Sequence, residues 1–328
     1  MSNPGAKTPK TPQASFTCPS LPPVRERRAV AGGPRVASPR VAPARPGTVA
    51  HMIDLHSHST FSDGSESPEH VVELAAAAGC SAVALTDHDG TDGIARAATR
   101  ATELGVALVA GCEVSCSAKG TMHVLCYFVG DGESPLQEEL TRLRGDRATR
   151  NLEMAQRLAE LGLPVTLGDV TAEAGGVGIG RPHFAAVLVR NGAATSVQDA
   201  FDRYLAKGAP GYVPKTRVEA AAILDLATRS GGVAVLAHPL SLGLAPHELG
   251  VELQHLADLG LTGIECYYGR YDPSTRAELV SLADGLGLVA TGGSDFHGTY
   301  KPDLSMGTGT GDLDVPDRVL AELESRRP

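Results

Sequence analysis

Three features that would define whole classes of protein are missing from this 328-residue sequence. No apolar run approaches the roughly 20 residues needed to cross a bilayer, so we expect no membrane-spanning segment. The six cysteines are scattered and predict no disulfide framework, which makes a reducing cytoplasm the simplest expected location. Basic residues are not in excess, because the net charge is −9. We therefore expect no surface for long duplex nucleic acid.

The N-terminal segment differs from the rest of the chain in composition. Residues 1–48 contain ten prolines and little hydrophobic periodicity, which is typical of a disordered tail. The first fifty residues hold eight Lys or Arg and one acidic residue, so the remainder of the chain is distinctly acidic. Met52 stands just before the first predicted strand end, and we regard it as an alternative start of the native protein, with the tail as an upstream extension.

Short apolar runs alternate with amphipathic stretches after the tail. The runs that we interpret as buried parallel strands cover residues 49–53, 83–85, 106–109, 233–236 and 288–290. The stretches with helical periodicity cover residues 68–78, 93–104 and 217–228. This alternation predicts an α/β fold, either a βα barrel or an open sheet. In such folds the chemistry gathers at the C-terminal ends of the strands.

Residues that can bind a metal follow each of these predicted strands. His56 and His58 are one residue apart, so both imidazoles would point to the same side of a strand. The histidines and carboxylates at or beyond the other strand ends are Asp87, His88, Asp89, Glu113, His123, His238, Asp295 and His297. Neutral imidazoles and carboxylates are the ligands of a hydrolytic metal site. Asp87 and Asp89 flank His88, and we expect them to orient its imidazole or to cap the next helix.

The order of these residues resembles that of the polymerase-and-histidinol-phosphatase (PHP) family of metal-dependent phosphoesterases. The resemblance extends from about residue 53 to about residue 301. It rests on nine positions, which are His56, His58, Asp63, His88, Glu113, His123, His238, Asp295 and His297. The resemblance implies a distorted seven-stranded, TIM-like βα barrel with up to three metal ions in its mouth.

The resemblance also implies which residues hold each ion. The first ion would be bound by His56, His58, Glu113 and Asp295. The second would share Glu113 and add His123 and His238, and the third would take Asp63, His88 and His297. The run 122–129 around His123 is strand-like, so a buried core histidine is the alternative there. The residues expected to be catalytic are His56, His58, Glu113, His238 and Asp295.

We expect two to three divalent ions, with manganese favoured and iron or zinc as alternatives. Two such ions close together lower the pKa of a shared water, and the resulting hydroxide can attack a phosphate ester in line. The predicted cofactors therefore match a hydrolytic reaction at phosphorus.

A mostly helical segment, residues 135–210, interrupts the barrel pattern. We expect it to lie as an inserted subdomain over the metal site, between barrel segments 49–134 and 211–328. Pro182 is well placed at a helix start, which would bring Arg181 to a helix N-terminus that can bind phosphate.

Other cationic residues are expected near the same substrate. Arg147 and Arg150 are predicted to open another helix, and Lys215 follows Pro214 in a compact loop. The motifs around them resemble one PHP branch, which comprises nucleoside 3′,5′-bisphosphate phosphatases and related enzymes that digest short RNA from the 5′ end. The substrate-binding residues expected on this basis are Arg181, Arg147, Arg150, His183 and Lys215.

The sequence therefore predicts a cytoplasmic metal-dependent phosphoesterase that acts on a small nucleotide or on short RNA. Removal of one phosphate from a nucleoside 3′,5′-bisphosphate and 5′-to-3′ trimming of short RNA are not separated by the residues. Histidinol-phosphate hydrolysis is an alternative with the same chemistry. An amidohydrolase-like C–N hydrolase also begins with His-x-His, but Asp63 and His297 and the lack of a clear bridging lysine argue against it. A non-catalytic metal-stabilised module is disfavoured because all nine positions are present.

Overall fold

The computed structural model describes residues 52–175 and 178–328. The predicted tail, residues 1–48, and the first part of the first predicted strand lie outside the described residues. Within the described ranges, no helix is both long enough and apolar enough to cross a membrane.

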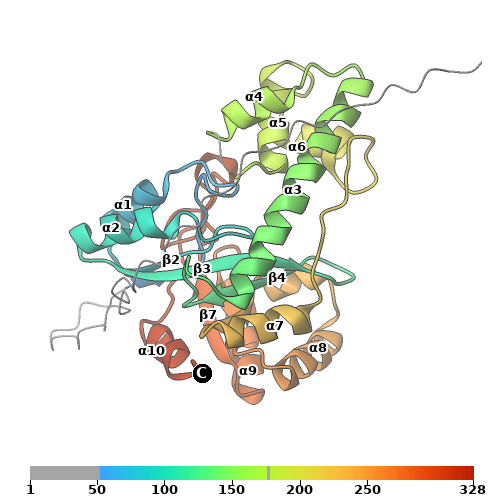
Figure 1. Cartoon of the computed structure of the whole chain (residues 1–328). Helices are drawn as coiled ribbons and strands as arrows, with labels where there is room; N and C mark the ends of the chain where they lie inside the picture. Colours follow the sequence, from blue (N-terminus) through green and yellow to red (C-terminus); the bar gives the residue numbers. More distant parts are fainter. Residues whose placement is uncertain (1–51, 176–177) are drawn as a thin grey trace, which may run out of the picture. The chain divides into compact units, whose positions relative to one another are not determined.

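Seven strands form one sheet whose spatial order follows the chain. They are β1 (Met52–Asp54), β2 (Cys80–Leu85), β3 (Ala107–Cys116), β4 (Met122–Tyr127), β5 (Val233–Leu236), β6 (Gly263–Tyr268) and β7 (Val289–Gly293). The backbone following β1 meets β7, because the amide of Leu55 donates to the carbonyl of Gly292 at 3.2 Å. The sheet is therefore a nearly closed barrel, as the sequence predicted (Figure 1).

One strand, in the run 122–129 for which no direction was predicted, is antiparallel to its neighbours. β4 is antiparallel to both β3 and β5, whereas the other neighbouring pairs are parallel. The connection from β3 to β4 is too short for a crossover helix, so the chain must turn back as a hairpin. As a result, His123 near the N-terminal end of β4 lies opposite Ser115 near the C-terminal end of β3. Glu113 also lies inside β3, because this strand is longer than predicted.

Helices pack on the outer side of the barrel. They are α1 (Pro68–Ala78), α2 (Ile94–Leu104), α7 (Ala220–Arg229), α8 (Pro246–Asp258) and α9 (Pro273–Gly285). The last helix, α10 (Arg318–Ser325), packs instead against the interior cluster. The bounds of α1 match the predicted helix because Ser67 caps its first turn by accepting from the amide of His70. Gly79 ends the same helix with φ of 86°, a conformation that favours glycine.

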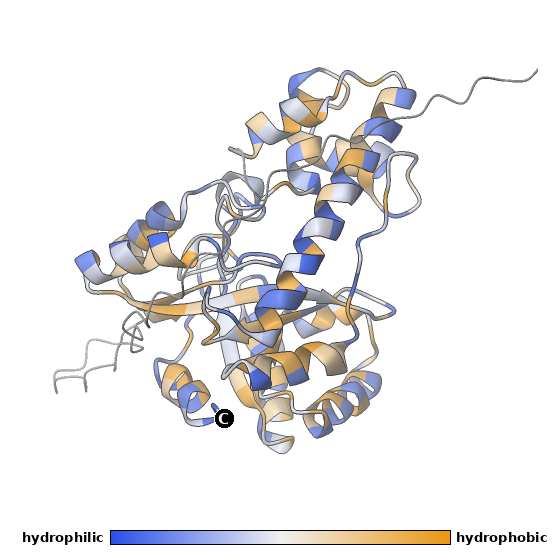
Figure 2. Ribbon diagram, in the orientation of Figure 1, coloured by the Kyte–Doolittle hydropathy of each residue, from blue (hydrophilic) through white to orange (hydrophobic). Residues whose placement is uncertain are grey.

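Alternate residues of each strand enter different hydrophobic clusters. Ala82 and Ala84 of β2 face the barrel interior, whereas Val83 and Leu85 pack with α1 and α2. The interior cluster also includes Leu320 and Leu323 of α10. In Figure 2, β3 and β4 are mainly hydrophobic, and α8 and α10 carry both hydrophobic and hydrophilic residues. Burial on both faces explains the nearly continuous apolar strand sequences.

A run of helices separates β4 from β5 in the chain. It comprises α3 (Pro135–Glu160), α4 (Leu167–Glu173), α5 (Arg181–Arg190), α6 (Val197–Ala200) and the π-helix η1 (Phe201–Leu205). The second half of α3 and the following helices share a hydrophobic cluster of their own, with Phe184 and Leu188 at zero exposure. In Figure 1, α4, α5 and α6 gather around the far end of α3. Arg147 and Arg150 lie in the middle of α3, so the prediction that they open a helix was wrong.

Candidate metal centre

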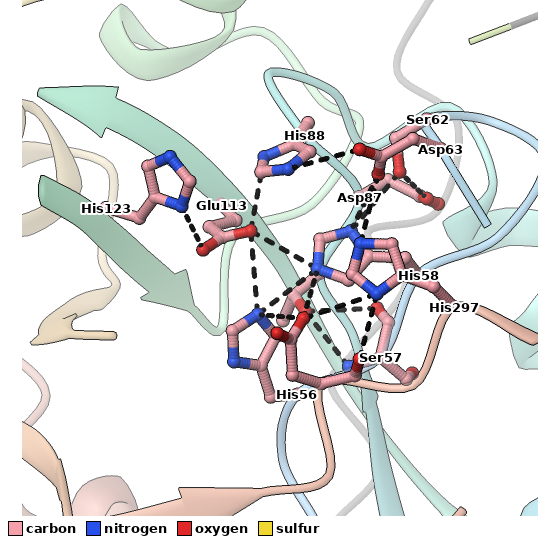
Figure 3. Close-up of polar contacts among 12 residues, drawn as sticks. His56, Ser57, His58, Ser62, Asp63, Asp87, His88, Glu113, His123 and His297 are labelled. Atoms are coloured by element: carbon pink, nitrogen blue, oxygen red, sulfur yellow. Dashed lines mark hydrogen bonds and ion pairs between the residues drawn. The ribbon is translucent and has the colours of Figure 1, made fainter. Parts of the chain in front are cut away.

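The nine residues singled out in the sequence come together at one rim of the barrel. They arise from the loop after β1, the ends of β2, β3, β5 and β7, and the start of β4. In Figure 3, Glu113 lies between His123, His88, His58 and His56. The antiparallel direction of β4 matters here, since it brings His123 to the rim where its neighbours end.

Glu113 presents its two carboxylate oxygens to different imidazoles. Its Oε1 lies 2.8 Å from Nδ1 of His123 and 3.2 Å from Nε2 of His238. Its Oε2 lies 3.5 Å from Nε2 of His56 and 3.2 Å from Nε2 of His58. A carboxylate that faces two separate sets of nitrogen donors has the geometry of a bridge between two cations.

Asp63 collects a second group of imidazoles. Its Oδ1 lies 3.3 Å from Nε2 of His297, and its Oδ2 lies 3.7 Å from Nε2 of His88. Yet Asp63 Oδ1 and His88 Nδ1 are buried and have no hydrogen-bond partner. Buried polar atoms without hydrogen-bond partners are costly, and cations bound by this cluster would offset that cost.

Among residues 52–175 and 178–328, three sets of donor atoms are compact enough to hold a metal ion. Within each set all donor atoms lie within 4.8 Å of one another, and the sets are His58, Asp63, His88 and His297; His56, His58 and Asp295; and His88, Glu113 and His123. Nitrogen and oxygen donors of this kind suit divalent transition metals. The residues present therefore fit a metal-binding role.

The pKa shifts of His58 and Glu113 are also consistent with a metal site. Burial, with His297 alongside, lowers the pKa of His58 to about 4, so its imidazole is neutral near pH 7. Burial would raise the pKa of Glu113, but His123, His88 and His56 outweigh it and hold that pKa well below its usual range. The pKa of His56 is raised well above its usual value, because the nearby carboxylates of Glu265 and Asp295 outweigh the effect of burial. His58 and Glu113 are therefore in the neutral and ionised forms, respectively, that bind metal ions.

Glu265 is a functional residue that the sequence analysis missed. This fully buried carboxylate of β6 accepts from Nδ1 of His56 at 2.9 Å and from the backbone amide of His238 at 2.7 Å. It thereby fixes which nitrogen of His56 faces the cluster. The available signal was a single acidic residue inside the apolar run 263–268, but β6 itself was not predicted.

Asp295 is held from outside the cluster as well. Its Oδ2 accepts from the Tyr268 hydroxyl at 2.9 Å and from Lys301 Nζ at 2.6 Å. Its Oδ1 is left facing Nε2 of His56 and of His58, each at 3.5 Å. Asp295 and His238 also adopt positive φ, of 56° and 28°, which is strained for these residues and typical of functional sites.

The two acidic residues beside His88 do not play the predicted roles. Asp87 accepts from the hydroxyls of Ser59 and Ser62, each at 2.6 Å, and Ser62 in turn contacts Nδ1 of His58 at 3.3 Å. Asp87 therefore supports His58 through Ser62. Neither acid caps the next helix, because the N-cap of α2 is Gly93.

Asp89 instead pairs with two of the cationic residues that were predicted to bind substrate. Its Oδ2 forms an ion pair with Arg147 of α3 and another with Lys215, at 2.9 Å. Lys215 also donates to Ser115 Oγ at 2.7 Å. Asp89 is 1% exposed, so this network links α3 and the loop before α7 to the rim of the barrel.

The remaining predicted substrate residues lie around the start of α5. Arg181 packs against the rings of Phe201 and Tyr212, at 5.8 and 5.9 Å from the ring centroids. Arg150 is buried and donates to the neutral Asn151 side chain, and burial next to other cations lowers its pKa to about 10. His183 Nδ1 accepts from the amide of Gly180 at 2.9 Å, which makes it a cap of α5.

Known proteins are similar to this chain in sequence and in fold. The PHP domain family matches residues 54–165. The 5′-3′ exoribonuclease Rnm of Escherichia coli is 35% identical over 252 residues, which cover 76% of this chain and 86% of that protein. A 3′,5′-nucleoside bisphosphate phosphatase of Chromobacterium violaceum is 33% identical over 277 residues, covering 84% of this chain and 97% of that protein.

Among solved structures, a protein from Bifidobacterium adolescentis assigned as a metal-dependent phosphoesterase superposes with a TM-score of 0.75 and 30% identity. The superposition covers 85% of this chain and 97% of the other. The barrel, the donor cluster and these relatives agree with one another. The chain therefore belongs to the PHP family of metal-dependent phosphoesterases.

Proposed function

We propose that this protein hydrolyses a phosphate ester of a small nucleotide at two to three divalent metal ions. The observation that carries the proposal is the position of Glu113, whose two oxygens face two separate sets of imidazoles. The ions would be held by the eight residues of the compact donor sets together with His238, which contacts Glu113, and we favour manganese. When bound, such ions lower the pKa of water and neutralise charge on the reacting phosphate.

The chain's own residues prepare the site for this role. Glu265 orients His56, and Tyr268 and Lys301 leave one oxygen of Asp295 for the cluster. Burial keeps bulk water from competing for the donor atoms, and it strengthens every electrostatic contact inside the site.

The identities of the relatives support a nucleotide substrate. One relative is a nucleoside bisphosphate phosphatase, and another is a 5′-3′ exoribonuclease. Both need a site that accepts a phosphorylated nucleoside. We also propose that residues 135–210 form an inserted subdomain that supplies cationic residues beside the metals, with Arg181 as the partner of a second phosphate. Arg181 packs on two rings and pairs with no carboxylate of the described chain.

Phosphate release from a panel of substrates tests the proposal. The panel contains a nucleoside 3′,5′-bisphosphate, a short 5′-phosphorylated RNA and histidinol phosphate, each with Mn²⁺ supplied. Release of phosphate from the bisphosphate, or of nucleotides from the RNA, supports a nucleotide substrate. Preference for histidinol phosphate, or inactivity toward every member of the panel, would overturn it.

A further inference from the structure

A cavity of about 320 Å³ opens beside the metal centre. His88 belongs both to the donor cluster and to the wall of this cavity. The other walls come from parts of the chain that are far apart, with Phe61 after β1, Ala148 on α3, Leu167 at the start of α4 and Ile179 before α5. The cavity therefore exists only where the helical segment meets the barrel.

The contact between these two parts is close. A Cβ atom added to Gly178 would lie 2.4 Å from the backbone of Phe61 and of Ser62, so only glycine fits there. Gly178 also has φ of 52°, which favours glycine. The backbone next to Ile179 is thus held against the backbone of Phe61, and the two side chains line the same space.

The walls suit a flat, largely apolar group with a polar edge. Phe61 offers an aromatic ring, and the guanidinium of Arg96, 5.6 Å from its centroid, steadies that ring. Leu167 and Ile179 add aliphatic surface. The polar groups of the lining include Arg144 and Asp92, which lie 3.3 Å apart and are 37% and 55% exposed. Both side chains are partly exposed, and they supply hydrogen-bond donors and an acceptor to the wall of the cavity.

The volume limits what can enter. Small-molecule sites in proteins measure about 300–1,000 Å³, and this cavity lies at the lower end of that range. A single base with its sugar matches this size, whereas a stacked run of bases does not. Stacking on an aromatic ring is also how proteins commonly hold a single base.

We propose that this cavity binds the nucleobase of the nucleotide whose phosphate reaches the metal centre, with Phe61 as the stacking surface. The inference rests on the proposed function and names the substrate subsite that the metal donors do not provide. His88 would stand between the two subsites, with the phosphate on one side and the base on the other.

Binding of adenosine tests the cavity without any turnover. Adenosine carries no phosphate, so its binding does not depend on hydrolysis. Saturation-transfer NMR should detect adenosine on the native protein and not on Ala148→Phe, whose ring would fill the cavity. Thr149→Phe is the matched control, because Thr149 is the exposed next residue of α3 and does not line the cavity. Equal adenosine binding by all three proteins, or none by the native protein, would overturn the inference.

Kinetics then tests the role of Phe61. Phe61→Ala should raise KM for a nucleoside 3′,5′-bisphosphate by about 5- to 150-fold, the range expected for loss of one base–aromatic stack. The effect on ribose 5-phosphate, which lacks a base, should be at least about tenfold smaller, and Phe61→Tyr should restore most of the affinity. Equal losses on both substrates would contradict a base subsite. Inactivity of the native protein toward phosphate esters would instead defeat the proposed function, while adenosine binding would still report on the cavity.

Discussion

Single residues decide how the cluster presents its donor atoms. The two oxygens of Glu113 face different imidazoles. The neighbouring histidines are held in turn by residues that do not belong to the metal-binding set. Glu265 orients the His56 imidazole. Ser62 contacts the His58 imidazole and is itself hydrogen-bonded to Asp87. Loss of such supporting contacts typically weakens metal binding by about 10- to 100-fold.

We expect Glu265→Gln to weaken metal binding by about 10- to 100-fold, because the amide cannot hold the His56 imidazole as the carboxylate does. Phosphate release should fall at limiting Mn²⁺ and recover when Mn²⁺ is raised. Titration of Mn²⁺ by calorimetry measures the affinity directly. A variant with native affinity but low activity would show that Glu265 acts on the reaction itself.

The second residue-scale prediction concerns a phosphate that does not react. Arg181→Ala should lower kcat/KM for a nucleoside 3′,5′-bisphosphate by about 10- to 1000-fold, because the guanidinium can hold a phosphate through two parallel hydrogen bonds. Hydrolysis of an aryl phosphate should change much less, and Arg181→Lys should recover only part of the loss.

Arg190→Ala is the control for this experiment, since Arg190 lies on the same helix, is exposed and pairs with Glu173. It should leave both substrates unaffected. An equal fall of Arg181→Ala on both substrates would mean that Arg181 serves the reacting phosphate or the fold.

At the scale of elements, the network around Asp89 joins α3 to the barrel rim. Asp89→Asn keeps the side-chain shape and tolerates the positive φ of 55°, yet it removes the charge that faces Arg147 and Lys215. Loss of one partner of a buried ion pair costs about 3–5 kcal/mol of unfolding free energy. Urea denaturation should show a loss of this order.

The matched control is Asp92→Asn, whose partner Arg144 lies at 3.3 Å on the surface. It should cost less than about 1 kcal/mol. Equal stability of the two variants would mean that Asp89 does not hold the helical segment in place.

Helix α9 offers a test of pH dependence away from the cluster. Hydrogen bonds from Ser274 and Thr275 to the N-cap Asp272 lower its pKa to about 2. A lowered pKa in the folded state stabilises the protein above the unfolded pKa of about 3.9, and that stability is lost as the pH falls toward 2. The advantage of the native protein over Asp272→Ala should therefore shrink between about pH 5 and pH 3.

Asp272→Asn separates the cap from the charge, because asparagine also caps helices and does not titrate. Its advantage over Asp272→Ala should stay constant across the same pH range in denaturant titrations. If the native protein showed the same constant advantage, the carboxylate of Asp272 would not be the titrating group.

At the scale of the whole molecule, periodicity predicted an α/β fold, and the resemblance to the PHP family selected the barrel and the nine donor positions. The bounds of α1 and α2 were predicted to within one residue, whereas α8 and α9 were not predicted. The direction of β4 was not predicted, because apolar runs carry no information about orientation and only the length of the connection does. β6 was missed because Glu265 interrupts its apolar pattern. Arg147 and Arg150 do not start a helix, because α3 continues through Gly145 despite the low helix propensity of glycine.

Side-chain partners were the least predictable feature. Arg147 and Lys215 were predicted to bind substrate, and no local pattern indicated that Asp89 would pair with both. Such pairings join residues about 58 and 126 positions apart and depend on how the helical segment packs on the barrel, which local patterns do not encode.

The metal content of protein purified without chelator shows whether the nine clustered residues hold metal ions. Elemental analysis should find two to three divalent ions per chain in the native protein. Glu113→Ala should retain fewer ions, because one carboxylate faces both sets of donors. Native protein without stoichiometric metal, or a Glu113→Ala variant with the full complement and full activity, would contradict the account.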